Sequence, residues 1–224
     1  MLAIWDGAGS VKLLSLLLQG TITTLQIFLL TLLLSLPLGL TIALGRICTH
    51  KWISGPLKLF ILIMRGTPLL LQLIFVYFAP SYMLPEGLRF RFPRFTAAII
   101  AFTLNYAAYF AEIYRGGIES IPRSQYEAAA VLGFTNAQTF LRIILPQVIK
   151  RILPPISNEV ITLIKDTALV QILGISELFR VAKNESSRIF STTPLFVAGL
   201  IYLFMNWIVT KIFHNTEKKL SYYK

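Results

Sequence analysis

Residues 126–133 read Tyr-Glu-Ala-Ala-Ala-Val-Leu-Gly, and residues 141–146 read Leu-Arg-Ile-Ile-Leu-Pro. The first run predicts a short helix of small residues, and the second predicts another short helix. Both lie in a basic, semi-apolar segment between long apolar stretches. A segment that only reverses the chain between two membrane spans has no need to fold. We therefore expect this one to dock against a partner at the membrane surface.

Apolar stretches long enough to cross a membrane make up most of the remaining chain. Of the 224 residues, 55% are hydrophobic and only 14% are charged, whereas a soluble domain carries about a quarter charged residues. Each stretch reaches the roughly 20 residues that span about 30 Å of hydrocarbon, and each is apolar all round, unlike a helix of a soluble bundle. We predict an all-α integral membrane protein, a single transmembrane domain over residues 1–224. Its five transmembrane helices are expected at Leu14–Leu44, Leu57–Ala79, Phe95–Ile113, Ile152–Leu173 and Pro194–Phe213.

The net charge of +11 indicates orientation rather than nucleic-acid binding. The Lys and Arg residues are spread over loops and form no patch interleaved with aromatic residues, so we expect no nucleic-acid partner. They are more numerous in the loops that lie inside if the N-terminus is outside, as the positive-inside rule requires, although the basic cluster at 89–94 opposes this. We predict a multi-pass chain with an outside N-terminus, a cytoplasmic C-terminus and a cytoplasmic loop at residues 114–151.

Several kinds of site find no support in the residue pattern. Cys48 is the single cysteine, which excludes a disulfide within the chain. His50 and His214 have no metal-ligand spacing, and no catalytic triad can be placed. We expect neither a metal site nor a catalytic site.

Local signals predict how the cytoplasmic loop folds. Pro122 is suited to open a helix, and Gly133 can end it in a left-handed conformation. Thr135 can cap a second helix that runs to Leu145, before Pro146. Two readings follow: a hairpin that lies on the lipid surface, or a wedge that enters a groove of a cytoplasmic protein.

The fourth predicted span carries an unusual set of polar residues. Because successive helical residues are 100° apart, Glu159, Thr162 and Asp166 point within about 60° of one another. The two carboxylates are two turns, roughly 10 Å, apart on that face, a spacing that can hold a cationic ammonium group. Lys165 lies off the face and can neutralise one acid or meet a substrate carboxylate. The alternative is a structural Lys–carboxylate pair between helices.

Polar residues also occur within the second and third predicted spans. Asn105 is deep enough to reach a ligand near the middle of the membrane, while Glu112 and Arg115 are one turn apart and suited to form an ion pair at the cytoplasmic end. Pro68 predicts a kink in the second span. The backbone polar groups freed there need protein or water as a partner, so Thr67 is expected to line a pathway or to sit at a plain kink.

Four sequence motifs resemble those of one transporter family. Residues 127–133 (Glu-Ala-Ala-Ala-Val-Leu-Gly) with 144–146 (Ile-Leu-Pro) resemble the EAA signature of permease subunits from bacterial ATP-binding-cassette (ABC) importers. Residues 64–72 (Met-Arg-Gly-Thr-Pro-Leu-Leu-Leu-Gln), 104–117 and 164–169 (Ile-Lys-Asp-Thr-Ala-Leu) resemble the branch that takes up polar amino acids. The resemblance covers most of residues 20–213.

This resemblance implies a five-helix permease subunit in the bacterial cell membrane, the inner or plasma membrane. It would pair with a second permease subunit, as a homodimer or heterodimer, above two ATP-binding subunits. An extracellular or periplasmic binding protein would deliver a polar amino acid. The chain has no Gly-rich phosphate loop, so it is expected to be non-catalytic and without a cofactor of its own, with ATP and Mg²⁺ bound by the ATPase partners.

The resemblance also assigns roles to residues. The 114–151 loop would be the coupling helix in a groove of the ATPase, with contacts from Glu127, Ala128, Ala129, Gly133, Leu145 and Pro146. Substrate would be held by Asn105, Glu159, Lys165 and Asp166, to which the polar positions Thr67 and Thr162 are added from the residue pattern.

Other functions fit parts of the sequence. An ion-coupled secondary carrier could use the three ionisable residues of the fourth span as a relay, although it would leave the folded loop unexplained. A membrane scaffold could recruit a cytoplasmic protein without transporting anything. An ABC permease for another solute would keep the same architecture.

Overall fold

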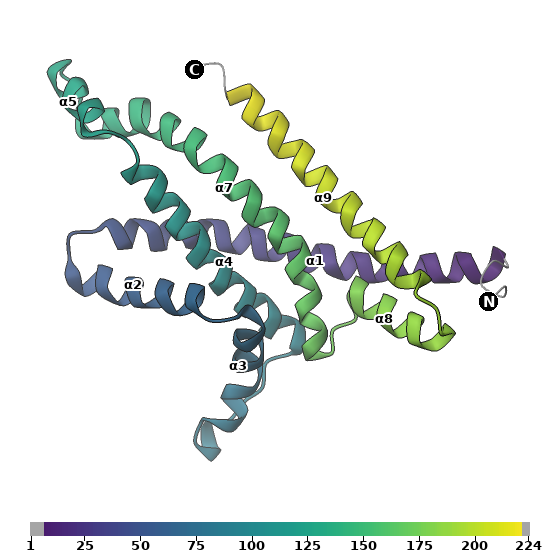
Figure 1. The fold of residues 1–224 in the computed structure, drawn as a ribbon. Coiled ribbons are helices and arrows are strands. Elements are labelled where there is room, and N and C mark those ends of the chain that lie inside the picture. Colours follow the sequence, from purple (N-terminus) through teal and green to yellow (C-terminus); the bar gives the residue numbers. More distant parts are fainter. Residues whose placement is uncertain (1–6, 221–224) are drawn as a thin grey trace. The chain divides into compact units, whose positions relative to one another are not determined.

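The computed structural model describes residues 7–220, so both ends of the predicted permease domain, residues 1–6 and 221–224, lie outside the described residues. Every regular element within 7–220 is helical, as the sequence predicts. The elements (Figure 1) are α1 (Gly7–Ile47), α2 (Lys51–Gly66), α3 (Leu69–Tyr82), the 3-10 helix η1 (Glu86–Leu88), α4 (Arg94–Glu119), α5 (Arg123–Val131), α6 (Asn136–Gln138), the π-helix η2 (Thr139–Ile144), α7 (Leu145–Asp166), the 3-10 helix η3 (Thr167–Leu173), α8 (Leu178–Ile189) and α9 (Thr193–Leu220).

By length and composition, three of the described helices can cross a membrane. These are α1, α4 and α9, and the broken pair of α2 and α3 makes a fourth if it counts as one span. The fourth predicted span, 152–173, falls on α7 and η3. Its helix α7 is not among the candidates, because it carries five charged side chains, at 150, 151, 159, 165 and 166. The expected count of five spans therefore stays a prediction.

The second predicted span is broken at Pro68. Helix α2 ends at Gly66 and α3 begins at Leu69, with Pro68 in an extended conformation at φ −62° and ψ 132°. A proline has no N–H and its ring clashes with the carbonyl four residues earlier. The expected kink is thus a complete interruption of the helix.

The chain forms two compact units. The first comprises the residues up to 33 with 67–103 and 161–208, and the second comprises 34–66, 104–160 and the residues from 209 on. The first unit holds α3 and α8 whole, and the second holds α2, α5 and α6.

Within the first unit, α1 and the start of α8 meet backbone to backbone. A Cβ added at Gly20 would lie 2.9 Å from the Leu178 Cα and 3.0 Å from the Leu178 nitrogen. The Leu178 N–H donates to the Thr24 hydroxyl at 3.2 Å. Only a residue without a side chain allows this approach, and small residues serve close helix packing in membranes.

A buried carboxylate organises the same region. Glu177 is fully buried, and its two oxygens accept hydrogen bonds of 2.7 Å from the N–H groups of Phe179 and Arg180. Tyr202 of α9 donates its hydroxyl to the same carboxylate at 3.0 Å. Burial raises the pKa of the Glu177 carboxyl, although these donors act in the opposite direction. Glu177 is the N-cap of α8, which begins at Leu178 and runs to Ile189.

The second unit has a core of small and branched residues. Three alanines of α4 pack against α1 and α2, and a Cβ at Gly39 would come within 2.9 Å of the Phe110 Cβ. Short side chains bring the helices together and let dispersion contacts replace lipid contacts. The buried members are Ile42, Ala43, Ile61, Ala107, Ala108 and Ala111.

Replacing Gly20 should therefore destabilise the first unit. Gly20→Ala forces a methyl group onto the Leu178 backbone, which cannot rotate away, and overpacking of this kind costs about 1–3 kcal/mol. We expect a lower Tm for the detergent-purified chain. Gly199→Ala is the matched control, because a Cβ there meets nothing within 4 Å. Equal Tm values for the two variants would contradict the close backbone contact.

Candidate coupling and substrate sites

The loop that the sequence predicts to be cytoplasmic folds into a helical hairpin inside the second unit. Helix α5 ends in a Schellman motif: the Phe134 N–H bonds to the Ala129 carbonyl at 3.1 Å, and the Gly133 N–H to the Ala130 carbonyl at 3.0 Å. Gly133 has φ +78°, a left-handed conformation that glycine adopts without steric cost. The predicted helix from Pro122 to the glycine stop is confirmed, with Pro122 as the N-cap.

The next helix, α6, begins at Asn136 and has Thr135 as its N-cap. The Thr135 hydroxyl accepts from the Gln138 N–H at 3.3 Å, and the Gln138 side chain accepts from the Thr135 N–H at 3.0 Å, forming a capping box. The predicted cap is confirmed. Only the segment 132–135 separates the two helices, which leaves the hairpin little freedom at its turn.

The predicted end of the second helix is wrong. Instead of stopping at Leu145, the helical backbone continues from α6 through η2 and Pro146 to the end of α7. Residues 139–144 form a π-helix, in which the Leu145 N–H bonds to the Phe140 carbonyl, five residues back. This wider turn relieves the clash between the proline ring and the carbonyl four residues earlier. The helix thus passes the proline and joins the hairpin directly to α7.

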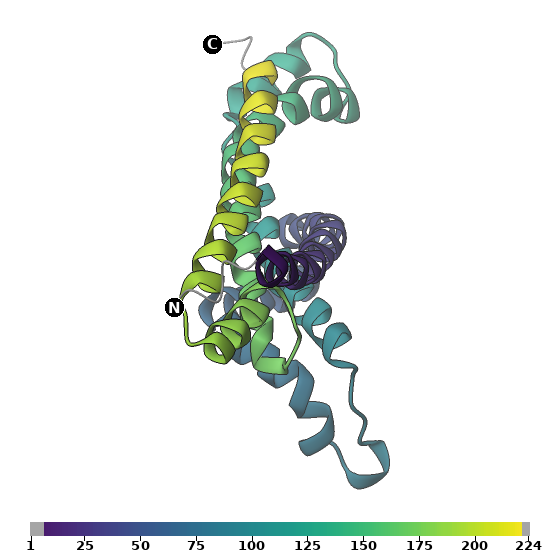
Figure 2. The same cartoon turned by 90° about the vertical axis from the view of Figure 1, so that its right-hand side faces the viewer.

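One side of the hairpin is fixed by a small core. Ile144 is fully buried and Val148 is 3% exposed, and both pack with Ile121 and with partly buried apolar residues of α4 and α7. The Gln147 amide donates to the Gln125 side chain of α5 at 3.3 Å. Figure 2 shows α5 beside the start of the α6–α7 run. The hairpin therefore packs against the first turns of α7 within the second unit.

The other side of the hairpin is exposed and apolar. Val131 is 88% exposed, Leu132 74% and Leu141 60%. Among the predicted coupling residues, Glu127, Ala128, Gly133 and Pro146 are exposed, Leu145 is half-buried and Ala129 is buried. Ala129 supports α5 from within, so the exposed positions form the surface that a partner can contact. The sequence pattern alone does not show that Ala128 is exposed while Ala129 is buried.

The capping box predicts how firmly the turn is held. Thr135→Ala removes the acceptor of the Gln138 N–H, a loss of about 1 kcal/mol. Amide hydrogens of residues 136–138 should then exchange about fivefold faster in hydrogen-exchange mass spectrometry. Thr135→Ser keeps the hydroxyl and should exchange at the parent rate. An unchanged rate in Thr135→Ala would show that the cap does not hold the turn.

The expected substrate residues of α7 lie opposite its buried face. Val160, Leu163 and Ile164 are buried. Along the other side of the helix, Thr162 and Lys165 are exposed, and Glu159 and Asp166 are half-buried. Their directions at 100° per residue place all four within about a third of the circumference. Lys165 takes part in no ion pair among the described residues. The choice between a substrate site and a structural Lys–carboxylate pair stays a prediction.

The other two expected substrate residues sit at the break of the second span. Thr67 is exposed, and its carbonyl and hydroxyl accept hydrogen bonds from the Gln72 amide at 3.1 and 2.8 Å. Asn105 is 4% exposed, and its amide donates to the Met64 carbonyl at 3.1 Å. Met64 is four residues before Pro68, so its carbonyl is the one that the proline leaves without a helical donor.

Sequence reasoning missed this partnership of Asn105 and Met64. Pro68 gave the signal for it. The carbonyl four residues before a proline has no helical donor, so in hydrocarbon it needs a hydrogen bond from a side chain elsewhere in the chain. The expected ion pair further along α4 is confirmed: Arg115 binds both Glu112 and Glu119.

The expected substrate residues fall in both units. Thr67, Thr162, Lys165 and Asp166 belong to the first, and Asn105 and Glu159 belong to the second. Their joint action on one ligand stays a prediction. Within residues 7–220 no group of three or more His, Cys, Asp or Glu side chains could hold a metal ion.

Comparison with known proteins shows a family match over most of the chain. The model for "binding-protein-dependent transport system inner membrane component" matches residues 35–222. The arginine transport system permease protein ArtQ of Bacillus subtilis is 37% identical over 220 residues, covering 96% of this chain and 97% of that protein. The histidine/lysine/arginine/ornithine permease protein HisM of Escherichia coli K12 is 33% identical over 207 residues, covering 89% and 87%.

Solved structures agree with the fold. An amino acid ABC transporter crystallised with histidines superposes with a TM-score of 0.83 at 34% identity, covering 96% of this chain and 98% of that one. An inward-facing methionine ABC transporter superposes with a TM-score of 0.71 at 17% identity, covering 92% and 96%. The second likeness concerns the fold alone.

Proposed function

The chain belongs to the family of binding-protein-dependent transport system inner membrane components, and on this premise we propose that it is the transmembrane permease subunit of an ABC importer for polar amino acids. The observation that carries the proposal is the cytoplasmic hairpin, prefolded by its own caps and core and apolar on its exposed side. Relatives named for arginine, for octopine and for histidine, lysine and ornithine support the substrate class.

Two ATP-binding subunits are the proposed partners of the hairpin. An exposed apolar tip next to an exposed carboxylate suits a groove with an apolar floor and a basic rim. Because the backbone is helical from α6 through α7, a push on the tip would move α7 as a rigid body. ATP and Mg²⁺ would act in the partners, and this chain would convert their closure into helix movement.

The polar side of α7 is the proposed binding surface. Ionisable groups at membrane depth are costly and usually face a polar cavity or another subunit. A second permease subunit, identical or related, would close a cavity over this side, with an external binding protein delivering the solute. The carboxylates of Glu159 and Asp166 would hold an ammonium group, and Lys165 would meet a carboxylate. Such contacts favour transport only if one conformation binds the solute better than the other.

The orientation follows from the same proposal. The hairpin must lie in the cytoplasm to reach ATPase subunits, which places the N-terminus outside, since three predicted spans separate the N-terminus from the hairpin. The proposed location is the bacterial cell membrane, with the binding protein outside it.

Substitution at the hairpin turn should uncouple ATP hydrolysis from uptake. Gly133→Asp puts a side chain at φ +78° and a charge beside the apolar tip. We expect uptake per ATP hydrolysed to fall about tenfold, while the spans still insert. The readout is amino acid uptake and ATPase activity of the assembled transporter in proteoliposomes. Gly55→Asp, also exposed and with free space around it, is the matched control on the predicted cytoplasmic side.

Normal coupling in Gly133→Asp would count against the docking role of the hairpin. Uptake driven by an ion gradient in vesicles that lack the ATPase subunits would favour the ion-coupled carrier instead.

Neutralising a carboxylate of α7 should weaken substrate use. Asp166→Asn and Glu159→Gln each remove a charged partner of an ammonium group, and we expect the solute concentration for half-maximal ATPase stimulation to rise about tenfold. Glu217→Gln in α9 is the control, because it also removes one negative charge but lies outside α7. Unchanged stimulation in both α7 variants would contradict the substrate role of these carboxylates, and a parent transporter that no solute stimulates would favour the scaffold function. A different solute preference in the parent would identify an ABC permease for another solute.

A further inference from the structure

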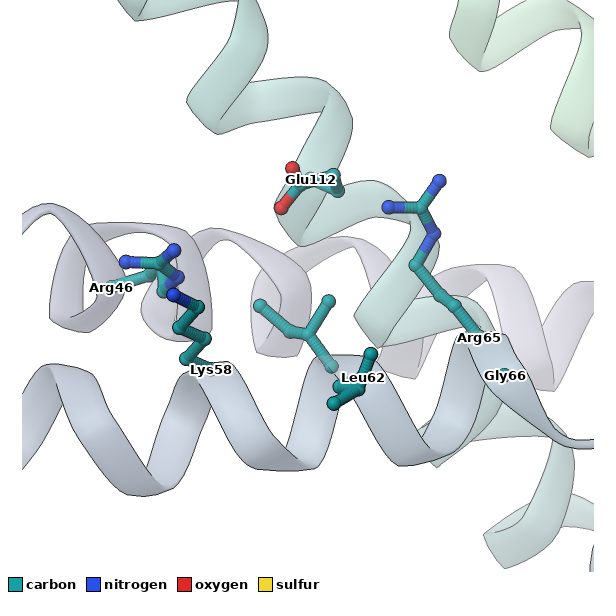
Figure 3. Close-up of a pocket in the computed structure, with 7 residues that line it drawn as sticks. Arg46, Lys58, Leu62, Arg65, Gly66 and Glu112 are labelled. Atoms are coloured by element: carbon teal, nitrogen blue, oxygen red, sulfur yellow. The ribbon is translucent and has the colours of Figure 1, made fainter.

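Three basic side chains converge on one open hollow in the second unit. It measures about 350 Å³ and lies between α1, α2 and α4. In Figure 3, Arg46 and Lys58 lie side by side at one end, and Arg65 stands at the other end, near Gly66. Glu112 is the single acidic residue of the lining.

The positive charge of this hollow is only slightly offset. Among the described residues, neither Arg46 nor Lys58 takes part in an ion pair. The Glu112 carboxylate is already bound by Arg115. The Arg65 guanidinium carbon lies 5.3 Å from the Tyr109 ring centroid, an orientation held by a cation–π contact. Three cations therefore face a single, engaged carboxylate, and an anion would complete the site.

The surroundings of the hollow show what kind of anion fits. Leu62 in the lining is 67% exposed, and Leu59 and Ile63 beside it are 57% and 47% exposed. Leu44 of α1 is 53% exposed, and Trp52 at the start of α2 is 94% exposed, which suits an aromatic residue at the membrane interface. A cationic hollow that continues into exposed apolar helix surface matches a molecule with an anionic head and apolar tails.

We propose that this hollow binds the phosphate headgroup of an anionic phospholipid. The phosphodiester would contact the Arg46 guanidinium, a planar fork suited to two phosphate oxygens, and the Lys58 ammonium. The acyl chains would lie along the exposed leucines of α2. Basic pockets between membrane helices on the cytoplasmic side bind such headgroups, and the predicted orientation places the connection between α1 and α2 on that side. This site is distinct from the polar side of α7 and from the hairpin.

The test compares lipid retention in the assembled transporter. We would reconstitute it in nanodiscs of phosphatidylcholine and phosphatidylglycerol, release it, and count bound lipids by native mass spectrometry. The parent should retain phosphatidylglycerol in preference to phosphatidylcholine. Arg46→Gln and Lys58→Gln should each reduce that preference about fivefold, the effect of removing one surface charge near anionic lipid.

Two matched variants make the result specific. Lys51→Gln with Lys219→Gln removes two exposed charges outside the hollow and should leave the preference unchanged. Arg46→Lys with Lys58→Arg keeps both charges and should retain it, which separates loss of charge from loss of folding. Equal retention of the two lipids by the parent, or an equal loss in the Lys51→Gln/Lys219→Gln variant, would overturn the proposal.

A separate arm distinguishes a lipid from a soluble anion. Inorganic phosphate added before release should not displace phosphatidylglycerol, because it lacks the tails. Full displacement by inorganic phosphate would overturn the lipid assignment in favour of a soluble phosphate compound.

Discussion

In hydrocarbon, a backbone N–H or C=O without a partner costs several kcal/mol, because no water can replace the lost hydrogen bond. The break at Pro68 creates this problem at the Met64 carbonyl, and the Asn105 amide solves it at 3.1 Å. Gln72 does the same for the Thr67 carbonyl and hydroxyl. A polar residue that looked free to bind a ligand is thus already engaged by the helix break. Any role of Asn105 toward substrate must be compatible with that bond.

At other helix ends, the backbone N–H and C=O groups also find hydrogen-bond partners, supplied there by capping residues. Glu177 supplies two carboxylate oxygens to the start of α8, and Thr135 with Gln138 supplies a capping box to α6. At the end of α5, the N–H groups of Gly133 and Phe134 turn back and bond to the last carbonyls of that helix. The capping box and the Schellman turn hold the hairpin in a folded conformation through its own hydrogen bonds. A hairpin that is already folded can dock without a large loss of conformational entropy. A movement of the partner would then be passed to the helix that follows.

Charges that the fold itself does not use are grouped in two regions. Lys165 lies on the exposed side of α7, and Arg46 and Lys58 line the hollow beside α2; none of the three is in an ion pair among the described residues. By contrast, Arg115 is held by two glutamates. Keeping a charge at or near membrane depth without an internal partner is expensive. The two proposals assign each region a contact with a molecule other than this chain: a solute for Lys165 and a lipid headgroup for Arg46 and Lys58.

Composition and local pattern were enough to determine the helical membrane class, the stop at Gly133, the cap at Thr135 and the pair of Glu112 with Arg115. Each depends on residues within a few positions of one another, where propensity and hydrogen-bond geometry act directly. Only the tertiary structure decided that the helix continues past Pro146, that Ala129 is buried while Ala128 is exposed, and that Asn105 binds Met64. Those outcomes depend on residues far apart in the chain or on an altered helical turn, and no local pattern records which distant group comes to satisfy a carbonyl or cover a side chain.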